Sequence, residues 1–559
     1  MITLFEKIRV SWIPELFALI TQGFLLWKIA PLQVDPHHDG IILGAAIATS
    51  DGRYGNSGAF TQYGPISPLI QGIFLRFTEN SEIALRYFTA LQCLLIAILI
   101  YFLIRELFSR IDGLIASVYW VFASAIWTTS FPGALLPWPS ILSTLVLLIA
   151  FIFLIKLASN ETRFAKIHNS LLVSSGFLIG IAGFIRIQSF LALPLILIAL
   201  YAHRKSSPLR FIPIILGTSL GVASVIFWLI AIGSWNSFVY QVLILPFLNY
   251  TGLGNGNNYN RFQMAMYLLE AVLFSMVIYI ISHTRKFVRN INFTLLIVFI
   301  LGLVVLKTGV WITHQNNWPT IFRVGFGEPL DRIVTSPMYF GSFSVIIFSF
   351  LYLFRKPRLW LDLDLRESLC IAFGIVGVVQ LYPQSDVLHL WWIAPLVLPT
   401  SWIVVKKIGK VFNTIQVADY RIAISAFAMI GVSLAAVFIS QPWSEYKLPI
   451  LRGTYASKDK VEAINFYRKM EPFLVQGHTS FDCPDGVYSV LNGRYLPPDE
   501  WFVNWDIFPK DLQTNKGTIR ILCNKSAEYI DSESKRLDMK LVKYELFEKY
   551  KESYAVLHK

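Results

Sequence analysis

The chain has 559 residues, of which 55% are hydrophobic and 15% are charged, and its mean hydropathy is +0.56. These values lie outside the range of soluble globular domains, so we expect a polytopic membrane protein. The formal net charge of +13 does not indicate a nucleic-acid partner, because basic residues of membrane proteins collect in the loops that set orientation.

Apolar runs recur from the N-terminus to about residue 440. The first is too long for a signal-peptide core, and we interpret it as a retained helix. The two runs on either side of Arg186 are short enough to be one kinked helix. Merging them would place every later basic loop outside, so we interpret them as a tight hairpin that holds Arg186 in its turn. The pattern predicts about thirteen spans, at roughly 12–31, 87–104, 113–129, 139–156, 170–185, 189–202, 211–232, 264–282, 292–312, 336–354, 368–382, 390–405 and 420–440.

Lysine and arginine are concentrated in the short segments on one side of these spans, and this asymmetry predicts a cytoplasmic N-terminus. An odd number of spans then places the loop after the first span, and the chain after about Gln441, on the extracytoplasmic face of the membrane. We expect an all-α polytopic membrane domain at 1–440, with a long first outer loop at 32–86. The tail at 441–559 has ordinary charge density and mixed patterning, which predicts a small α/β extracytoplasmic domain. Spacing alone leaves a disulfide between Cys483 and Cys523 open. The expected location is the plasma (inner) membrane.

The first outer loop opens with the sequence DPHHD, from Asp35 to Asp39. Carboxylates and imidazoles at this density suit a divalent metal ion. However, adjacent side chains of an extended chain point in opposite directions, so only alternate members would face one ion. We therefore interpret His37 and His38 as hydrogen-bonding or interfacial residues. No cofactor is certain, and a metal at His38 and Asp39 stays open.

Polar and charged residues also recur in the later outer loops. Charges near a membrane are costly unless they are paired or solvated, so acids and arginines that recur at one face indicate a shared wet cavity. Ordinary solvated loops are the alternative. The candidates that would bind a substrate there, besides His37 and His38, are Tyr63, Arg186, Arg261, Arg323, Arg332, Asp386 and His389.

Four short stretches follow one another along the chain: HHDG, QYGP, GIAGFIRIQSFLALPLIL and YPQSDVLHLWWIAP. With about thirteen spans and an outer tail, they resemble the GT-C superfamily of integral-membrane glycosyltransferases. Within it, the layout is similar to the branch of protein O-mannosyltransferases and the lipid A aminoarabinose transferase. The first-loop acids of the O-mannosyltransferase branch are adjacent, whereas Asp35 and Asp39 stand four apart. This departure leaves open which acid has the family's role.

The resemblance implies transfer of a sugar from a polyprenyl-phosphate donor to an acceptor, which would be a lipid-linked glycan, a lipid, a wall polymer or a protein. An acceptor hydroxyl is a weak nucleophile, so a carboxylate should take its proton. We expect Asp35 to be that base, supported by Asp39 and His38, and we expect the arginines to stabilise the departing phosphate. Membrane lipids are further expected partners, and nucleic acid is not. A transporter, flippase or polymerase of lipid-linked saccharides is the competing class.

Overall fold

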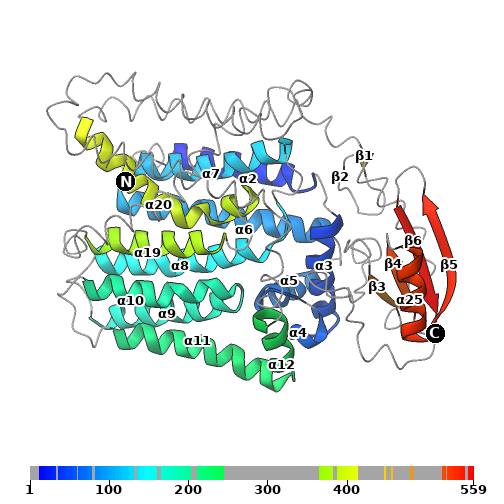
Figure 1. Cartoon of the computed structure of the whole chain (residues 1–559). Coiled ribbons are helices and arrows are strands. Elements are labelled where there is room, and N and C mark those ends of the chain that lie inside the picture. Colours follow the sequence, from blue (N-terminus) through cyan, green and yellow to red (C-terminus); the bar gives the residue numbers. More distant parts are fainter. Residues whose placement is uncertain are drawn as a thin grey trace.

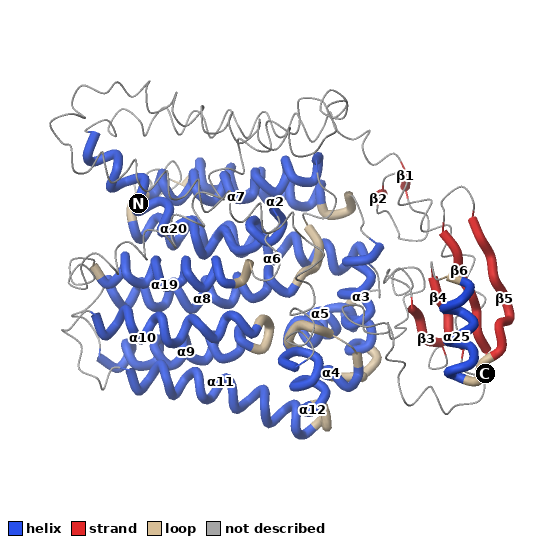
Figure 2. Tube along the Cα trace, viewed as in Figure 1, coloured by secondary structure: helices blue, strands red, loops and turns tan. Residues whose placement is uncertain are grey.

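Most described parts of the chain are helices that run side by side in a bundle, as Figures 1 and 2 show for this computed structural model. The composition predicts such a mostly helical architecture. The structure describes residues 12–32, 36–59, 61–78, 82–130, 135–159, 165–202, 211–244, 364–381, 387–412, 446–447, 455–456, 479–482, 519–523, 526–547 and 552–558.

Three described helices are long and apolar enough to cross a membrane, at Glu82–Leu107, Pro139–Ala158 and Phe211–Ala231. The runs predicted between 264 and 354 and at 420–440 lie outside the described residues, so the number of spans stays a prediction. The bundle helices are α2 (Ile13–Ile29), α6 (Glu82–Leu107), α7 (Arg110–Ser130), α8 (Pro139–Ser159), α9 (Ala165–Gly183), α10 (Ala192–Ala202), α11 (Phe211–Ala231), α19 (Leu365–Val379) and α20 (Val387–Phe412).

Stacked aromatic rings join the helices at the centre of the bundle. Phe151 of α8 stacks on Phe373 of α19, with ring centroids 4.2 Å apart. Trp120 of α7 stacks on Trp391 of α20 at 5.1 Å. Each of these two indole nitrogens donates to the other residue's backbone carbonyl, at 3.0 and 3.1 Å. Both tryptophans are therefore buried with their polar groups satisfied.

Helices α9 and α11 pack through glycines with their backbones in direct contact. A Cβ atom at Gly176 would lie 2.1 Å from the carbonyl oxygen of Ile214, and one at Gly217 would lie 2.0 Å from that of Val173. A second glycine follows each of these four residues later, at Gly180 and Gly221, where a Cβ atom would lie 2.7 and 2.5 Å from a carbonyl oxygen of the partner helix. Small residues at this spacing let membrane helices approach closely, so these two helices are held without intervening side chains.

The first outer loop is folded into helices α3 (Pro36–Ser50), α4 (Gly55–Gly58) and α5 (Ile66–Phe77). The expectation that the DPHHD stretch is an extended chain is therefore wrong from Pro36 onward. Proline is favoured at the first position of a helix, and the following run GIILGAAIAT is apolar enough to pack. His37, His38 and Asp39 thus occupy successive positions of a first helical turn.

The predicted hairpin is present. Helix α9 ends at Gly183, a short 3-10 helix η1 (Ile187–Leu191) follows, and α10 begins at Ala192. Arg186 lies in the turn. After α11 come α12 (Trp235–Phe238) and the π-helical segment η3 (Val239–Ile244). In Figure 1, α3, α4, α5 and α12 gather at one end of the bundle.

The described part of the tail contains a four-stranded sheet, which lies beyond the same end of the bundle in Figure 1. Its order is β3 (Thr479–Asp482), β4 (Ile519–Cys523), β6 (Glu552–His558), β5 (Lys540–Phe547). β3 pairs with β4 in parallel, and the other pairs are antiparallel. Helix α25 (Ala527–Leu537) contributes to the small apolar core beside the sheet. Strands β1 (Tyr446–Lys447) and β2 (Tyr455–Ala456) form a separate pair. The domain boundary at 441 and the disulfide stay predictions, because Cys483 lies outside the described residues.

Candidate functional site

The QYGP stretch and the arginine hairpin, which are far apart in sequence, meet at one end of the bundle. The amide of Gly64 donates to the carbonyl oxygen of Ile185 at 3.2 Å. A Cβ atom at position 64 would lie only 1.6 Å from the carbonyl oxygen of Phe184. Only glycine allows this approach, so the motif's glycine joins the first loop to the hairpin.

Arg186 is buried at this junction, with 4% of its surface exposed. Its guanidinium donates to the hydroxyl of Ser140, in the first turn of α8, and to the carbonyl oxygen of Gln380 at 3.0 Å. It therefore joins the hairpin to α8 and to the end of α19. The other arginines expected in the same pocket, Arg261, Arg323 and Arg332, lie outside the described residues.

A chain of aromatic rings lies beside this junction. Tyr63 meets Trp138 edge to face, with centroids 5.4 Å apart, and Trp138 stacks on Trp392 at 5.7 Å. The ring of His389 meets Trp392 at 4.8 Å. Two candidates far apart in the sequence, Tyr63 before α5 and His389 in the first turn of α20, are thus joined through Trp138 and Trp392.

Two buried polar side chains near Arg186 lack hydrogen-bond partners within the described part of the chain. They are Gln380, through both its amide nitrogen and its amide oxygen, and Trp392, through its indole nitrogen. Thr144 donates to the carbonyl oxygen of Trp392 at 2.9 Å, one helical turn after Ser140. The backbone of Trp392 therefore contacts α8 directly, and that of Gln380 is linked to α8 through Arg186. An unsatisfied buried polar group costs about 1–3 kcal/mol, so these atoms are candidates to bind a ligand.

Asp39 is held in a buried charged cluster that the sequence pattern missed. Arg86 of α6 donates to both of its carboxylate oxygens and, at 2.8 Å, to Glu82. The same guanidinium donates to the carbonyl oxygens of Ala30 and Leu32 after α2, at 3.1 and 2.7 Å. The start of α3 is thus fixed against the ends of α2 and α6. The four-residue spacing of Glu82 and Arg86 at the start of a predicted span is the signal that could have found it.

The structure describes little of the remaining candidates. Asp35 and Asp386 lie outside the described residues, and so do the side chains of His37 and His38, whose backbone belongs to α3. In the described chain, no three His, Cys, Asp or Glu side chains come together as a metal site. A metal ion at Asp39 would have to compete with the Arg86 guanidinium for the same oxygens, so this carboxylate fits a metal poorly.

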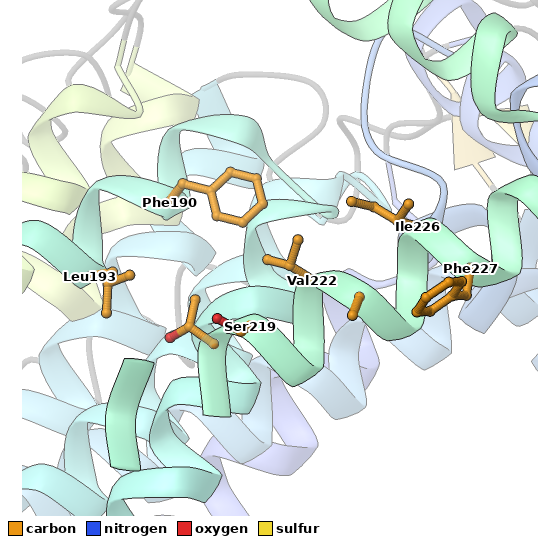
Figure 3. A pocket seen from close by; sticks show the side chains of 8 residues that line it. Phe190, Leu193, Ser219, Val222, Ile226 and Phe227 are labelled. Carbon is orange, nitrogen blue, oxygen red and sulfur yellow. The ribbon is translucent and has the colours of Figure 1, made fainter. Parts of the chain in front are cut away.

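An apolar groove has η1 and α10 on one side and α11 on the other (Figure 3). Its first lining residue, Phe190, follows Arg186 by four residues. The volume of the groove is about 540 Å³. The side chains in Figure 3 are mostly apolar, with two hydroxyls, and they converge on the space between the helices. They belong to Phe190, Leu193, Thr218, Ser219, Val222, Ala223, Ile226 and Phe227.

Comparisons with known proteins place this arrangement in a wider context. Residues 62–232 match the family model described as dolichyl-phosphate-mannose-protein mannosyltransferase. No curated protein matches the chain in a sequence search. Among solved structures, ArnT from Cupriavidus metallidurans bound to undecaprenyl phosphate is 12% identical, with 97% of each chain covered and a TM-score of 0.46. The archaeal oligosaccharyltransferase AglB from Archaeoglobus fulgidus, in complex with an inhibitory peptide and a dolichol-phosphate, is 14% identical. The match covers 95% of this chain and 68% of AglB, with a TM-score of 0.49.

At these TM-scores the two structural likenesses are too loose to support an argument about this chain. The family-model match includes QYGP, the Arg186 hairpin and the lined groove, which are the features that come together in space. Over residues 62–232, this match confirms the resemblance to the GT-C superfamily of membrane glycosyltransferases.

Proposed function

We propose that this chain transfers a sugar, a hexose or a pentose, from a polyprenyl-phosphate donor to an acceptor on the extracytoplasmic face of the plasma membrane. The acceptor is a lipid-linked glycan, a lipid, a wall polymer or a protein. In the reaction, the bond between the anomeric carbon and the phosphate oxygen breaks while a bond to the acceptor oxygen forms. The acceptor's proton passes to a carboxylate, and polyprenyl phosphate leaves with the electron pair.

One observation carries the assignment of the base. Arg86 binds both oxygens of Asp39 and thereby anchors the first turn of α3 to the ends of α2 and α6. Asp35 comes directly before that turn in the sequence. A general base works best on a rigid support, which favours Asp35. Asp39 is already paired and buried, so we assign it a positioning role, with His38 beside it in sequence.

The phosphate side is supported by Arg186. A guanidinium held by two protein groups is preorganised to stabilise negative charge that develops on a leaving phosphate. In this proposal Arg261, Arg323 and Arg332 share the role. The groove at Phe190 would take the first isoprene units of the donor, because it is apolar and Phe190 follows Arg186 by four residues in the hairpin.

The sugar would lie between the aromatic chain and the unsatisfied polar groups. Ligand sites combine apolar and aromatic walls with a few polar groups that fix orientation. Tyr63 and Trp138 supply rings, and the amide of Gln380 supplies both a donor and an acceptor. Asp386 and His389 stay substrate-binding candidates at the same end. A divalent metal stays an untested addition to this scheme.

The test uses the full chain in liposomes with a panel of radiolabelled polyprenyl-phosphate hexoses and pentoses, with membrane extract as the source of acceptor. Release of polyprenyl phosphate is measured together with label in the product. Asp35→Asn should lower transfer by roughly a hundredfold to ten-thousandfold, the usual effect of removing a general base. Donor binding and thermal stability should stay close to those of the unmodified chain.

The outcomes separate the alternatives. If Asp35→Asn keeps full activity while a stable Asp39→Asn variant is inactive, the two roles are exchanged. If both keep full activity, this assignment of the loop is wrong. Movement of labelled lipid across the bilayer without any release of polyprenyl phosphate would instead support a transporter or flippase, and chain extension of one lipid-linked saccharide by another would support a polymerase.

A further inference from the structure

A second groove lies between α6 and α8, at the end of the bundle opposite the candidate site. Ser140 belongs to the candidate site and Lys156 to this groove, and sixteen residues of α8 separate them by about 24 Å along the helix axis. The volume of the groove is about 430 Å³. Its lining consists of five apolar side chains and three charged ones: Leu99, Phe102, Leu103, Ile152, Ile155, Arg105, Glu106 and Lys156.

The charged side chains of this groove match a singly charged anion. Arg105 and Lys156 are the basic residues in the last turns of α6 and α8, and both are exposed. With the carboxylate of Glu106, the three groups sum to one positive charge at neutral pH. The guanidinium of Arg105 lies 5.3 Å from the ring centroid of Trp12 and donates to the hydroxyl of Tyr101 at 3.4 Å. These contacts hold it at the edge of the groove.

The apolar side of the groove continues along α6. Leu91, Leu95 and Phe102 are 51%, 42% and 46% exposed, and they follow one another at helical spacing on the same side of the helix. From Leu91 to Arg105 the helix rises about 21 Å, which exceeds the roughly 15 Å depth of one leaflet's hydrocarbon. An acyl chain that starts at the groove would therefore meet apolar surface throughout its leaflet.

We propose that this groove binds an anionic phospholipid, with its phosphodiester at Arg105 and Lys156 and one acyl chain along the α6 stripe. Basic pockets between membrane helices bind anionic head groups on the cytoplasmic side, where such lipids are enriched. The expected orientation of the chain puts this end on that side. The site does not share residues with the proposed transferase site, so its test is independent of glycosyl transfer.

The experiment measures lipid retention by native mass spectrometry on the delipidated full chain, titrated with phosphatidylglycerol, phosphatidylcholine or phosphatidylethanolamine. Phosphatidylglycerol should bind most tightly. Arg105→Gln and Lys156→Gln should each weaken its binding about tenfold, the effect of one charge-assisted hydrogen bond. The matched control is Lys28→Gln, which removes the same charge from the opposite end of the bundle, where Lys28 lies over the rings of Phe24 and Trp27. It should leave binding unchanged.

Two further measurements test whether the acyl chain of the lipid contributes to binding. Leu99→Trp should fill the groove and weaken phosphatidylglycerol binding while both cations are kept. Water-soluble glycerol phosphate should not displace the lipid at equal concentration. The proposal is wrong if phosphatidylcholine or phosphatidylethanolamine binds as well as phosphatidylglycerol, or if glycerol phosphate competes equally. It is also wrong if Lys28→Gln weakens binding as much as Lys156→Gln, or if Lys156→Gln and Leu99→Trp both bind like the unmodified chain.

Discussion

Arg86 donates hydrogen bonds to both carboxylate oxygens of Asp39, and neither side chain is exposed to solvent. The two residues are 47 positions apart and belong to different helices, α6 and α3. Because the same guanidinium also donates to the carbonyl oxygens of Ala30 and Leu32 after α2, a single side chain fixes the start of the first outer loop. The position of the loop thus depends on Arg86, a residue of α6 that belongs to none of the sequence motifs.

Removing one member of this pair should destabilise the protein strongly. Arg86→Gln should lower the free energy of unfolding by about 3–5 kcal/mol, because it leaves the buried carboxylate of Asp39 without its cation. Asp39→Asn should lower it by about 1.5–3 kcal/mol, because Arg86 loses its hydrogen bonds to this carboxylate but stays paired with Glu82. The double variant should lose less than the sum of the two. Denaturant unfolding in detergent, followed by tryptophan fluorescence, measures all three.

The same loop offers a matched control in the exposed pair of Asp51 and Arg53, 3.5 Å apart. Asp51→Asn should change stability by less than about 1 kcal/mol, because exposed ion pairs contribute little. If Asp39→Asn were as mild as this control yet abolished transfer, Asp39 would take part in the chemistry and its positioning role would be wrong.

Arg186→Lys should not restore the function of Arg186. The guanidinium donates from two nitrogens to Ser140 and to the carbonyl of Gln380, whereas an ammonium has no planar fork to hold both. We expect release of polyprenyl phosphate to fall about tenfold or more in Arg186→Lys and further in Arg186→Gln. Equal activity of Arg186→Lys and the unmodified chain would show that charge alone suffices.

Gln380→Leu should separate stability from activity. The substitution removes two unsatisfied amide atoms from a buried position, so the melting temperature should stay level or rise. Sugar transfer should fall, mainly through a higher KM for the donor, if these atoms bind the sugar. Thermal unfolding and donor titration are run on the same preparation. A drop in melting temperature with unchanged KM would assign the amide to the fold alone.

Gly217→Ala should disrupt the packing of α9 against α11. Its Cβ would lie 2.0 Å from the carbonyl oxygen of Val173, and overpacking of this kind typically costs about 1–3 kcal/mol. The control is Gly23→Ala in α2, where the nearest atom would be a Leu94 methyl at an ordinary 3.5 Å. The control should be neutral or stabilising, because alanine favours helices. Similar melting temperatures for the two variants would contradict close backbone packing.

Much of the bundle could be predicted because the length of an apolar run in the sequence shows whether a helix formed from it could cross a membrane. The hairpin at Arg186 followed from the charge pattern, because merging its two short runs into one kinked helix would place every later basic loop outside. Helix α3 was missed because polar residues at its start masked the apolar run from Gly40 onward. A short helix that packs on one side has no need of a long apolar run, so hydropathy does not reveal it.

The sequence could predict which residues belong to the candidate site but not which of them contact one another. Contacts between residues distant in the sequence depend on how the helices pack. Tyr63 and His389 were selected as polar loop residues, and nothing near Tyr63 in the sequence predicts that Trp138 packs against it. The contact of His389 with Trp392 is local, because the two residues are three apart in α20. Arg86 was counted only as a basic residue near a membrane surface. Its two acidic partners lie four residues before it in α6 and 47 residues before it in α3, and only the second pairing needs the fold.

The first outer loop has bonds that span a long stretch of the chain, and these constrain the order in which the protein is assembled. Asn56 donates to Gln241, which is 185 positions later, and the amide of Gly64 donates to the carbonyl oxygen of Ile185. At translation rates of about 5–20 residues per second, roughly ten seconds or more pass between synthesis of Asn56 and of its partner. We therefore expect the loop to remain incompletely docked through the insertion of six further bundle helices, α6 to α11. A ribosome-arrested chain that stops before Gln241 should expose this loop to protease, whereas the finished chain should protect it.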